Sequence, residues 1–155
     1  MKSDGATFEQ HKIGDVHRTL ARTVSETDIV NFVNLCGFTE PLFMDMEFVA
    51  LESVFKGRPA PGAFTFCLSE GLVMQTGLIH GTGMSYLGSD IRIVAPVLAG
   101  DTIRVKVVVA AKRETSKPDR GIVTYTHQVV NRRGELVLEA TIKRMIRRGG
   151  PDRRV

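Results

Sequence analysis

The segment from Ala63 to Leu78 constrains the fold most, because it is apolar on nearly every face of a helix. A helix that is hydrophobic all round belongs in the middle of a protein, where other elements cover it. Pro59 and Pro61 precede this segment and restrict the backbone on both sides of themselves, so they separate the helix from the chain before it. We therefore predict a central helix over about residues 62–78.

From residue 83 onward the apolar residues follow the period of strands instead of helices. Valine-rich or alternating segments are separated by short turns, which predicts strands at about 83–95, 102–112, 122–130 and 136–147. Consecutive strands with short connections make an antiparallel sheet, and the apolar face of such a sheet needs a cover. The central helix supplies that cover. The sequence thus predicts an α+β protein of hotdog type, in which an antiparallel sheet wraps around a helix.

The chain before the central helix mixes strand and helix signals. Polarity alternates over residues 16–24, which predicts a strand. A helix over about 25–36 follows, with Ser25 as its cap and Gly37 at its end, and a short irregular helix is expected within 44–55. No internal boundary is visible, so residues 1–155 form one domain, whose last residues (about 149–155) we expect to be a flexible basic tail.

Composition and charge exclude several classes of protein. The chain has no run of 18 apolar residues and no signal-peptide core, so we expect a cytoplasmic protein with no membrane partner. The net charge of +4 fits an anionic partner, but the chain lacks Trp and a basic stripe interleaved with aromatics, so we expect no nucleic acid. No residues recur at metal-ligand spacing, and Cys36 and Cys67 are expected to be buried free thiols.

Residues 36–45 carry the segment Cys-Gly-Phe-Thr-Glu-Pro-Leu-Phe-Met-Asp. It resembles the signature Gly-Asp-x-Asn-Pro-Leu-His of the MaoC-like, (R)-specific enoyl-CoA hydratase family. Phe38 stands where the family has its aspartate, and Phe43 where it has its histidine. Two further segments resemble the family: residues 55–62 are similar to Phe-Gly-Gly-Arg-x-Ala-His-Gly, and residues 91–102 are similar to Phe-x-x-Pro-Val-x-x-Gly-Asp-Thr. The resemblance covers about residues 14–112.

The resemblance implies an acyl-thioester ligand, with CoA as part of the substrate and no separate cofactor. In the family the aspartate and histidine act as acid and base in adding water to the double bond. The thioester oxygen lies beside backbone N–H groups at the start of the central helix, a role that falls on Gly62 here. Phenylalanine cannot hold a proton, so Phe38 and Phe43, together with Pro61, are expected to line an apolar binding site instead.

Other residues near the motif are candidates for the missing groups. Glu40 takes the position of the motif's asparagine and is our candidate acid or base, although a solvated loop carboxylate is the alternative. Asp45 is expected to have a structural role in the loop. His80 follows the central helix and His127 lies within a strand, where a satisfied sheet residue is the simpler interpretation. Arg58 either meets the phosphates of CoA or is an ordinary surface residue.

Three functions remain open from the sequence. The first is an acyl-CoA hydratase or dehydratase of fatty acid metabolism, a lyase with a relocated proton-handling group. The second is a non-catalytic acyl-CoA-binding subunit whose partner carries the intact pair. The third, an acyl-CoA thioesterase, needs a carboxylate near the start of the helix, and Glu70 lies about two turns along it. A homodimer or a heterodimer with another hotdog subunit is expected, because an unpaired valine-rich edge is a liability.

Overall fold

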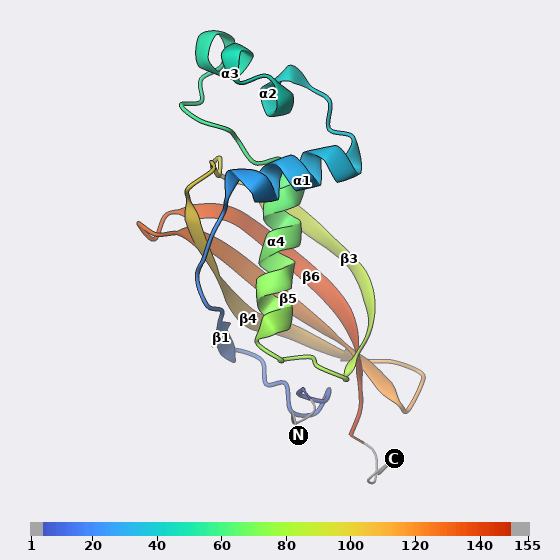
Figure 1. Cartoon of the computed structure of the whole chain (residues 1–155). Coiled ribbons are helices and arrows are strands. Elements are labelled where there is room, and N and C mark those ends of the chain that lie inside the picture. Colours follow the sequence, from blue (N-terminus) through green and yellow to red (C-terminus); the bar gives the residue numbers. More distant parts are fainter. Residues whose placement is uncertain (1–4, 150–155) are drawn as a thin grey trace.

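The computed structural model describes residues 5–149 and shows one sheet with a helix lying across it (Figure 1). The strands pair in the order β1–β4–β5–β6–β3, with β2 beside β4, and every pairing is antiparallel. Their bounds are β1 Val16–Arg18, β2 Arg22–Thr23, β3 Gly83–Ile93, β4 Thr102–Glu114, β5 Arg120–Asn131 and β6 Leu136–Arg147. The helices are α1 Glu26–Cys36, α2 Pro41–Met44, α3 Met46–Glu52 and α4 Gly62–Gln75.

The core lies between α4 and the face of the sheet that it crosses. Every second residue of β5 from Gly121 to Asn131 is buried, and the inward side chains of β4 and β6 continue this layer with Val107 and Ile142 fully buried. The alternation is what a sheet with one covered face requires. The helix contributes its own buried residues, among them Leu72. The predicted α+β fold, an antiparallel sheet around a central helix, is confirmed.

The central helix is less enclosed than its composition predicts. It ends at Gln75 instead of residue 78, and the chain turns through Gly77 at a φ of 76°. Met74 is 43% exposed and Cys67 is exposed, so one side of α4 faces outward. The expectation that Cys36 and Cys67 are buried is wrong: Cys36 ends α1, and Cys67 lies on the open side of α4. The apolar composition of residues 63–78 indicates that the helix is buried. It does not show whether the same chain buries every side of it.

Local capping residues set the elements above α4 (Figure 1). Ser25 and Asp28 form a capping box at the start of α1, and Gly37 ends that helix in the left-handed region at a φ of 69°. The single irregular helix predicted within 44–55 is two short helices, because Asp45 interrupts them. Its carboxylate accepts hydrogen bonds of 3.0 Å from the N–H groups of Glu47 and Phe48, which caps α3.

The strand predicted over 16–24 is interrupted as well. β1 and β2 both pair with β4, but between them the Thr19 hydroxyl takes the place of a backbone partner and accepts from the Val105 N–H at 2.9 Å. Leu20 next to it is 82% exposed. A polar side chain that bonds to the backbone competes with the regular ladder of hydrogen bonds, which accounts for the break.

The two edges of the sheet differ in how their strands are paired. Within residues 5–149, β3 pairs with β6 alone and leaves its other edge free, whereas β4 is covered by β1 and β2. The predicted basic tail of 149–155 lies outside the described residues except for Gly149, whose N–H donates to the Glu9 carboxylate at 2.8 Å. Among the described helices, none is long and apolar enough to cross a membrane.

Candidate functional site

The start of α4 lies beneath α1 and beneath α2 and α3, at the upper end of the molecule in Figure 1. We call residues 39–55, which contain α2 and α3, the overhang. Pro61 precedes the helix and supplies no side-chain cap, and Gly62 is its first residue. The first N–H groups of a helix have no partner within the helix, and the helix dipole favours negative charge there. A Cβ on Gly62 would lie only 3.0 Å from Cγ1 of Ile93, so even alanine would have to displace that side chain.

Aromatic rings fill the space between α1, α2 and the start of α4. Phe38 and Phe43, the two phenylalanines of the 36–45 motif, contact each other with ring centroids 5.9 Å apart. Phe32 joins them, 5.7 Å from Phe38 and 5.5 Å from Phe64 on α4. The motif thus brings its two phenylalanines together beside the helix, as an apolar cluster that can contact an acyl chain but cannot donate or accept a proton.

Glu40 lies between the two phenylalanines in sequence but not among the rings. It is exposed and precedes α2, and its side chain makes no capping hydrogen bond, while its carbonyl accepts from the Phe43 N–H at 2.9 Å. The carboxylate is therefore solvated. Its role as acid or base stays a prediction.

Arg58 is engaged by its own chain. Its Nε donates to Glu26 at 2.8 Å and its Nη1 donates to the Phe43 carbonyl at 2.8 Å, and its side chain is only 14% exposed. These contacts tie the start of α1 to the end of α2 and hold the aromatic cluster in place. A contact of Arg58 with CoA phosphates stays a prediction, although part of its hydrogen-bonding capacity is already used.

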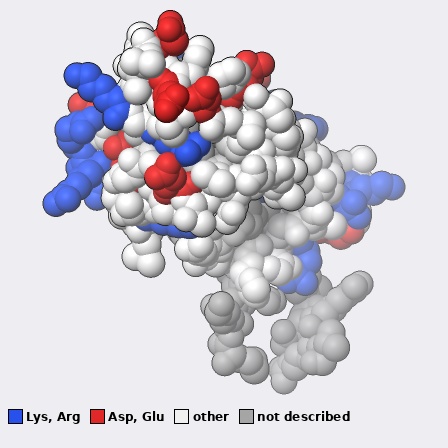
Figure 2. Space-filling view, turned by 45° about the horizontal axis from the view of Figure 1, so that its top comes forward, with Lys and Arg blue, Asp and Glu red and all other residues white. Residues whose placement is uncertain are grey.

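The overhang carries acidic side chains. Residues 39–55 contain Glu40, Asp45, Glu47 and Glu52 and no lysine or arginine. Figure 2, which turns this end of the molecule toward the viewer, shows red side chains over it. This charge repels phosphates and other anions, so it disfavours an anionic ligand across α2 and α3.

A buried polar cluster lies under α4, and sequence reasoning missed it. Glu70 points from the helix toward the sheet, where its Oε1 lies 3.1 Å from Nδ1 of His127 and its Oε2 accepts from Nη2 of Arg144. The side chains of His127, Arg144 and Glu70 are 1%, 9% and 16% exposed. The contact between Glu70 and His127 is close but not aligned as a hydrogen bond.

The charge of Glu70 is maintained by its neighbours. Burial raises the pKa of the Glu70 carboxyl, but His127 and Arg144 outweigh that effect and hold the pKa below its ordinary value. Tyr125 lies beside this cluster, with its ring centroid 6.3 Å from that of His127. On its other side, the Tyr125 hydroxyl lies 2.8 Å from Nε2 of His11. Tyr125 and His127 are two positions apart on β5 and therefore share one face of the strand. Only the fold shows that Glu70 on α4 lies against His127.

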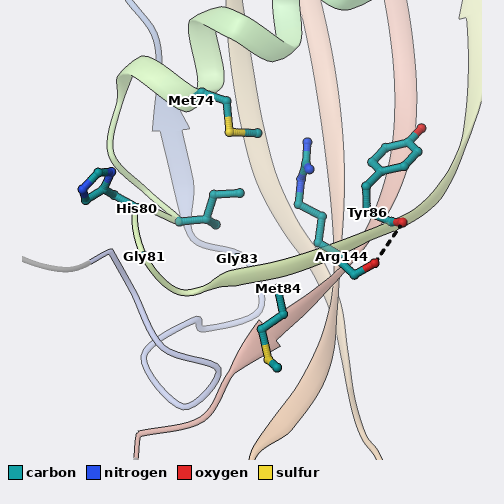
Figure 3. A pocket seen from close by; sticks show the side chains of 9 residues that line it. Met74, His80, Gly81, Gly83, Met84, Tyr86 and Arg144 are labelled. Atoms are coloured by element: carbon teal, nitrogen blue, oxygen red, sulfur yellow. Dashed lines mark hydrogen bonds between the residues drawn. The ribbon is translucent and has the colours of Figure 1, made fainter. Parts of the chain in front are cut away.

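The remaining histidine candidate lies at the other end of the helix. His80 is exposed on the loop after α4 and lines a pocket there (Figure 3). Gly62 is the first residue of α4, at the opposite end of the helix. His127, interpreted as an ordinary sheet residue, is instead part of the buried polar cluster with Glu70. Among residues 5–149 there is no group of three His, Cys, Asp or Glu that could hold a metal ion.

Residues 8–131 of this chain match the family described as the MaoC like domain. The protein MaoC of Klebsiella aerogenes is 36% identical over 113 residues, which is 73% of this chain but only 32% of that longer protein. The (R)-specific enoyl-CoA hydratase of Rhodospirillum rubrum is 32% identical over 120 residues, which is 76% of each chain.

Structures agree with the sequence matches. The crystal structure of a monoamine oxidase regulatory protein from Archaeoglobus superposes with a TM-score of 0.88 at 35% identity, covering 97% of this chain and 99% of that one. The predicted hotdog fold is therefore confirmed. The family match, the sequence relatives and the shared fold lead to one conclusion: this chain belongs to the MaoC-like domain family.

Proposed function

We propose that this protein binds acyl-CoA thioesters and is a hydratase or dehydratase of its family with a non-standard active site. The start of α4 carries this proposal, because Gly62 offers a backbone N–H beside an apolar aromatic cluster. A thioester carbonyl at that N–H would place its acyl chain against Phe38 and Phe43. The (R)-specific enoyl-CoA hydratase among the relatives supports the ligand class.

The hydration step needs a group that moves a proton. Water adds its hydroxyl to the β-carbon and a proton to the α-carbon, and negative charge develops on the thioester oxygen in between. The N–H of Gly62 and the helix dipole stabilise that charge. In this proposal Glu40 deprotonates the water and returns the proton to the α-carbon, since it lies between Phe38 and Phe43 in the sequence and its carboxylate makes no capping hydrogen bond.

A second function is favoured by the aromatic cluster itself. Phe32, Phe38, Phe43 and Phe64 make the site apolar, which suits binding of a chain better than ordering of a water molecule. In that case the protein is a non-catalytic subunit, and a partner hotdog chain with the intact aspartate and histidine performs the chemistry. Both versions place the protein in the cytoplasm as a homodimer or heterodimer.

The thioesterase alternative has the least support. Glu70 lies eight residues after Gly62, which is about 12 Å along a helix, so its carboxylate does not reach a carbonyl held at Gly62 within the same chain. It is also paired with Arg144 and close to His127.

Crotonyl-CoA hydration by the purified protein tests the proposal, with Glu40→Gln as the variant. Activity that this change abolishes supports Glu40 as the acid or base. No turnover together with saturable acyl-CoA binding supports the subunit function. Glu47→Gln on the same overhang is the matched control, since it removes an equal charge outside the motif. A wild-type protein with neither turnover nor binding contradicts the proposal.

A further inference from the structure

Residues 5–15, which we call the strap, cross the lower end of the molecule before β1 begins (Figure 1). Backbone hydrogen bonds hold the strap in place. The Gly5 N–H donates to the His80 carbonyl, in the loop after α4, at 2.6 Å. The Phe8 N–H donates to the Arg147 carbonyl, at the end of β6, at 2.9 Å. The strap therefore joins the loop after α4 to the sheet.

Phe8 anchors the middle of the strap. It is 5% exposed, and its ring lies so close to Gly121 on β5 that a Cβ on that glycine would overlap it. Nζ of Lys112 lies 4.5 Å from the ring centroid, and the guanidinium carbon of Arg148 lies 5.2 Å from it. Both cations are attracted to the face of the ring. These contacts do not titrate near neutral pH, so any pH-dependent step in the strap comes from another residue.

His11 is the second buried side chain of the strap, and it is 2% exposed. Its Nδ1 lies 2.8 Å from the Thr7 carbonyl oxygen, and its Nε2 lies 2.8 Å from the Tyr125 hydroxyl. A carbonyl only accepts, so the proton of the neutral ring is on Nδ1 and the Tyr125 hydroxyl donates to Nε2. Both ring nitrogens are thus satisfied in the neutral form.

Protonation of His11 conflicts with this arrangement. An N–H at Nε2 would point at the Tyr125 hydroxyl, whose own hydrogen would then need another acceptor. Within residues 5–149 that hydroxyl has no second hydrogen-bond partner, and Tyr125 is 2% exposed, so its hydrogen would be buried without a bond. The next titratable groups on the sheet, His127 and Arg144, face Glu70 instead.

The surroundings of His11 act mostly in the same direction. Burial lowers the pKa of its side chain, and His17 on β1 and Lys112 on β4 lower it further. The Thr7 carbonyl and Asp15 act against them without reversing the shift. Lys112 is close, because its Nζ donates to the His11 carbonyl at 2.7 Å. A proton on His11 is therefore disfavoured while the strap is closed.

The ion pair of the strap does not titrate in the same range. Burial raises the pKa of the Glu9 carboxyl, but the Gly149 N–H and Arg148 lower it to about 2. Glu9 therefore stays ionised, with its Oε1 2.6 Å from Nε of Arg148, throughout the range in which histidine titrates. A change of the strap near neutral pH is then attributable to His11.

The strap also holds one wall of a pocket. The loop after α4 and the first residues of β3 enclose a pocket of about 410 Å³ (Figure 3). Besides the bond from Gly5 to His80, the Ala6 N–H donates to the Leu78 carbonyl at 2.8 Å. A Cβ on Gly5 would overlap the backbone of this loop, so the two segments pack backbone against backbone. The position of the pocket wall thus depends on the strap.

We propose that the strap is a pH-sensitive latch: protonation of His11 releases the strap, and the loop that forms the pocket wall is released with it. The closed strap favours neutral His11, so its stability is complete above the ordinary histidine pKa of 6.5 and falls as pH drops below that value. Each pH unit below it weakens the closed state by up to about tenfold, until His11 is protonated in the closed strap as well. The latch does not depend on the acyl-thioester function.

Amide hydrogen exchange measures the opening. Peptides covering residues 5–15 and 76–83 are followed by mass spectrometry at pH 7.5 and 5.5, and each rate is divided by that of the unfolded chain at the same pH. In the wild type we expect the corrected rates of both peptides to rise by up to about tenfold at pH 5.5. His11→Gln cannot gain the proton and is expected to show no rise. His17→Gln, the matched control, is expected to keep it.

The outcomes decide between the latch and an ordinary terminal segment. Equal corrected rates of the wild-type strap at the two pH values overturn the proposal, and so does a rise that persists in His11→Gln. A strap that opens while the 76–83 peptide stays protected overturns the coupling to the pocket.

A second measurement covers the case in which His11→Gln leaves the strap open at both pH values. The ¹⁵N shifts of the His11 imidazole ring are then followed by NMR in the wild type. A neutral ring with its proton on Nδ1 at pH 7.5, titrating below 6.5, supports the latch. A ring that titrates at or above 6.5 overturns it.

Discussion

Replacing Arg144 with methionine is expected to destabilise the protein strongly, because it leaves the Glu70 carboxylate buried without its guanidinium. Removing one partner of a buried ion pair costs about 3–5 kcal/mol. Glu70 is 16% exposed and keeps His127 at 3.1 Å, so we expect the lower end, about 3 kcal/mol. For a chain of this size that corresponds to a fall in Tm of roughly 6–12 °C.

A second variant separates charge from packing. Glu70→Leu/Arg144→Met removes both charges and keeps apolar volume, and replacing a buried ion pair in this way is often neutral. We therefore expect the double variant to recover most of the stability that Arg144→Met loses. Urea unfolding at one fixed protein concentration gives the free energy of unfolding of each variant. The single variant Glu70→Leu is measured as well, so that the four proteins form a double-mutant cycle. If Arg144→Met lowers the free energy of unfolding by less than about 1 kcal/mol, the ion pair with Glu70 does not behave as a buried one, because exposed ion pairs contribute in that range.

Three further changes test separate parts of the structure. Gly62→Ala is expected to weaken acyl-CoA binding in calorimetry and to cost about 1–3 kcal/mol in urea unfolding, because its methyl group displaces Ile93. Asp45→Ala should cost about 1 kcal/mol in the same unfolding assay by removing the α3 cap. Burial raises the pKa of Glu9, but the Gly149 N–H and Arg148 lower it to about 2. This stabilisation is complete above the ordinary value of 4.5 and is lost as pH falls toward 2, so Glu9→Gln should lower Tm at pH 7 but converge with wild type near pH 2.

Features set by neighbouring residues were predictable from the sequence. Ser25 caps α1 and Gly37 ends it as expected, because both act on backbone groups within a few residues. The alternating polarity over 122–130 predicted a strand there, and β5 spans Arg120–Asn131 with alternate residues buried. The central helix was recognisable because few environments other than a protein core accept a helix without a polar face.

Features set by distant contacts were not predictable in this way. Glu70 and Arg144 are 74 positions apart, and only the packing of α4 on the sheet brings their charges together. The exposure of Cys67 depends equally on which side of α4 its chain leaves open. From the sequence, Arg58 was expected to be either a surface residue or a ligand of phosphate. The fold instead places Glu26 and the Phe43 carbonyl against it.

The proposed function requires that a thioester carbonyl binds at the start of α4, and the backbone amide of Gly62 reports on that binding. Crotonyl-CoA is titrated into ¹⁵N-glycine-labelled protein, and the glycine amide resonances are followed by NMR. We predict that the Gly62 resonance shifts saturably, while that of Gly134, in the turn between β5 and β6, stays in place. A Gly62 resonance that does not move at saturating crotonyl-CoA would show that the thioester carbonyl does not bind at the start of α4.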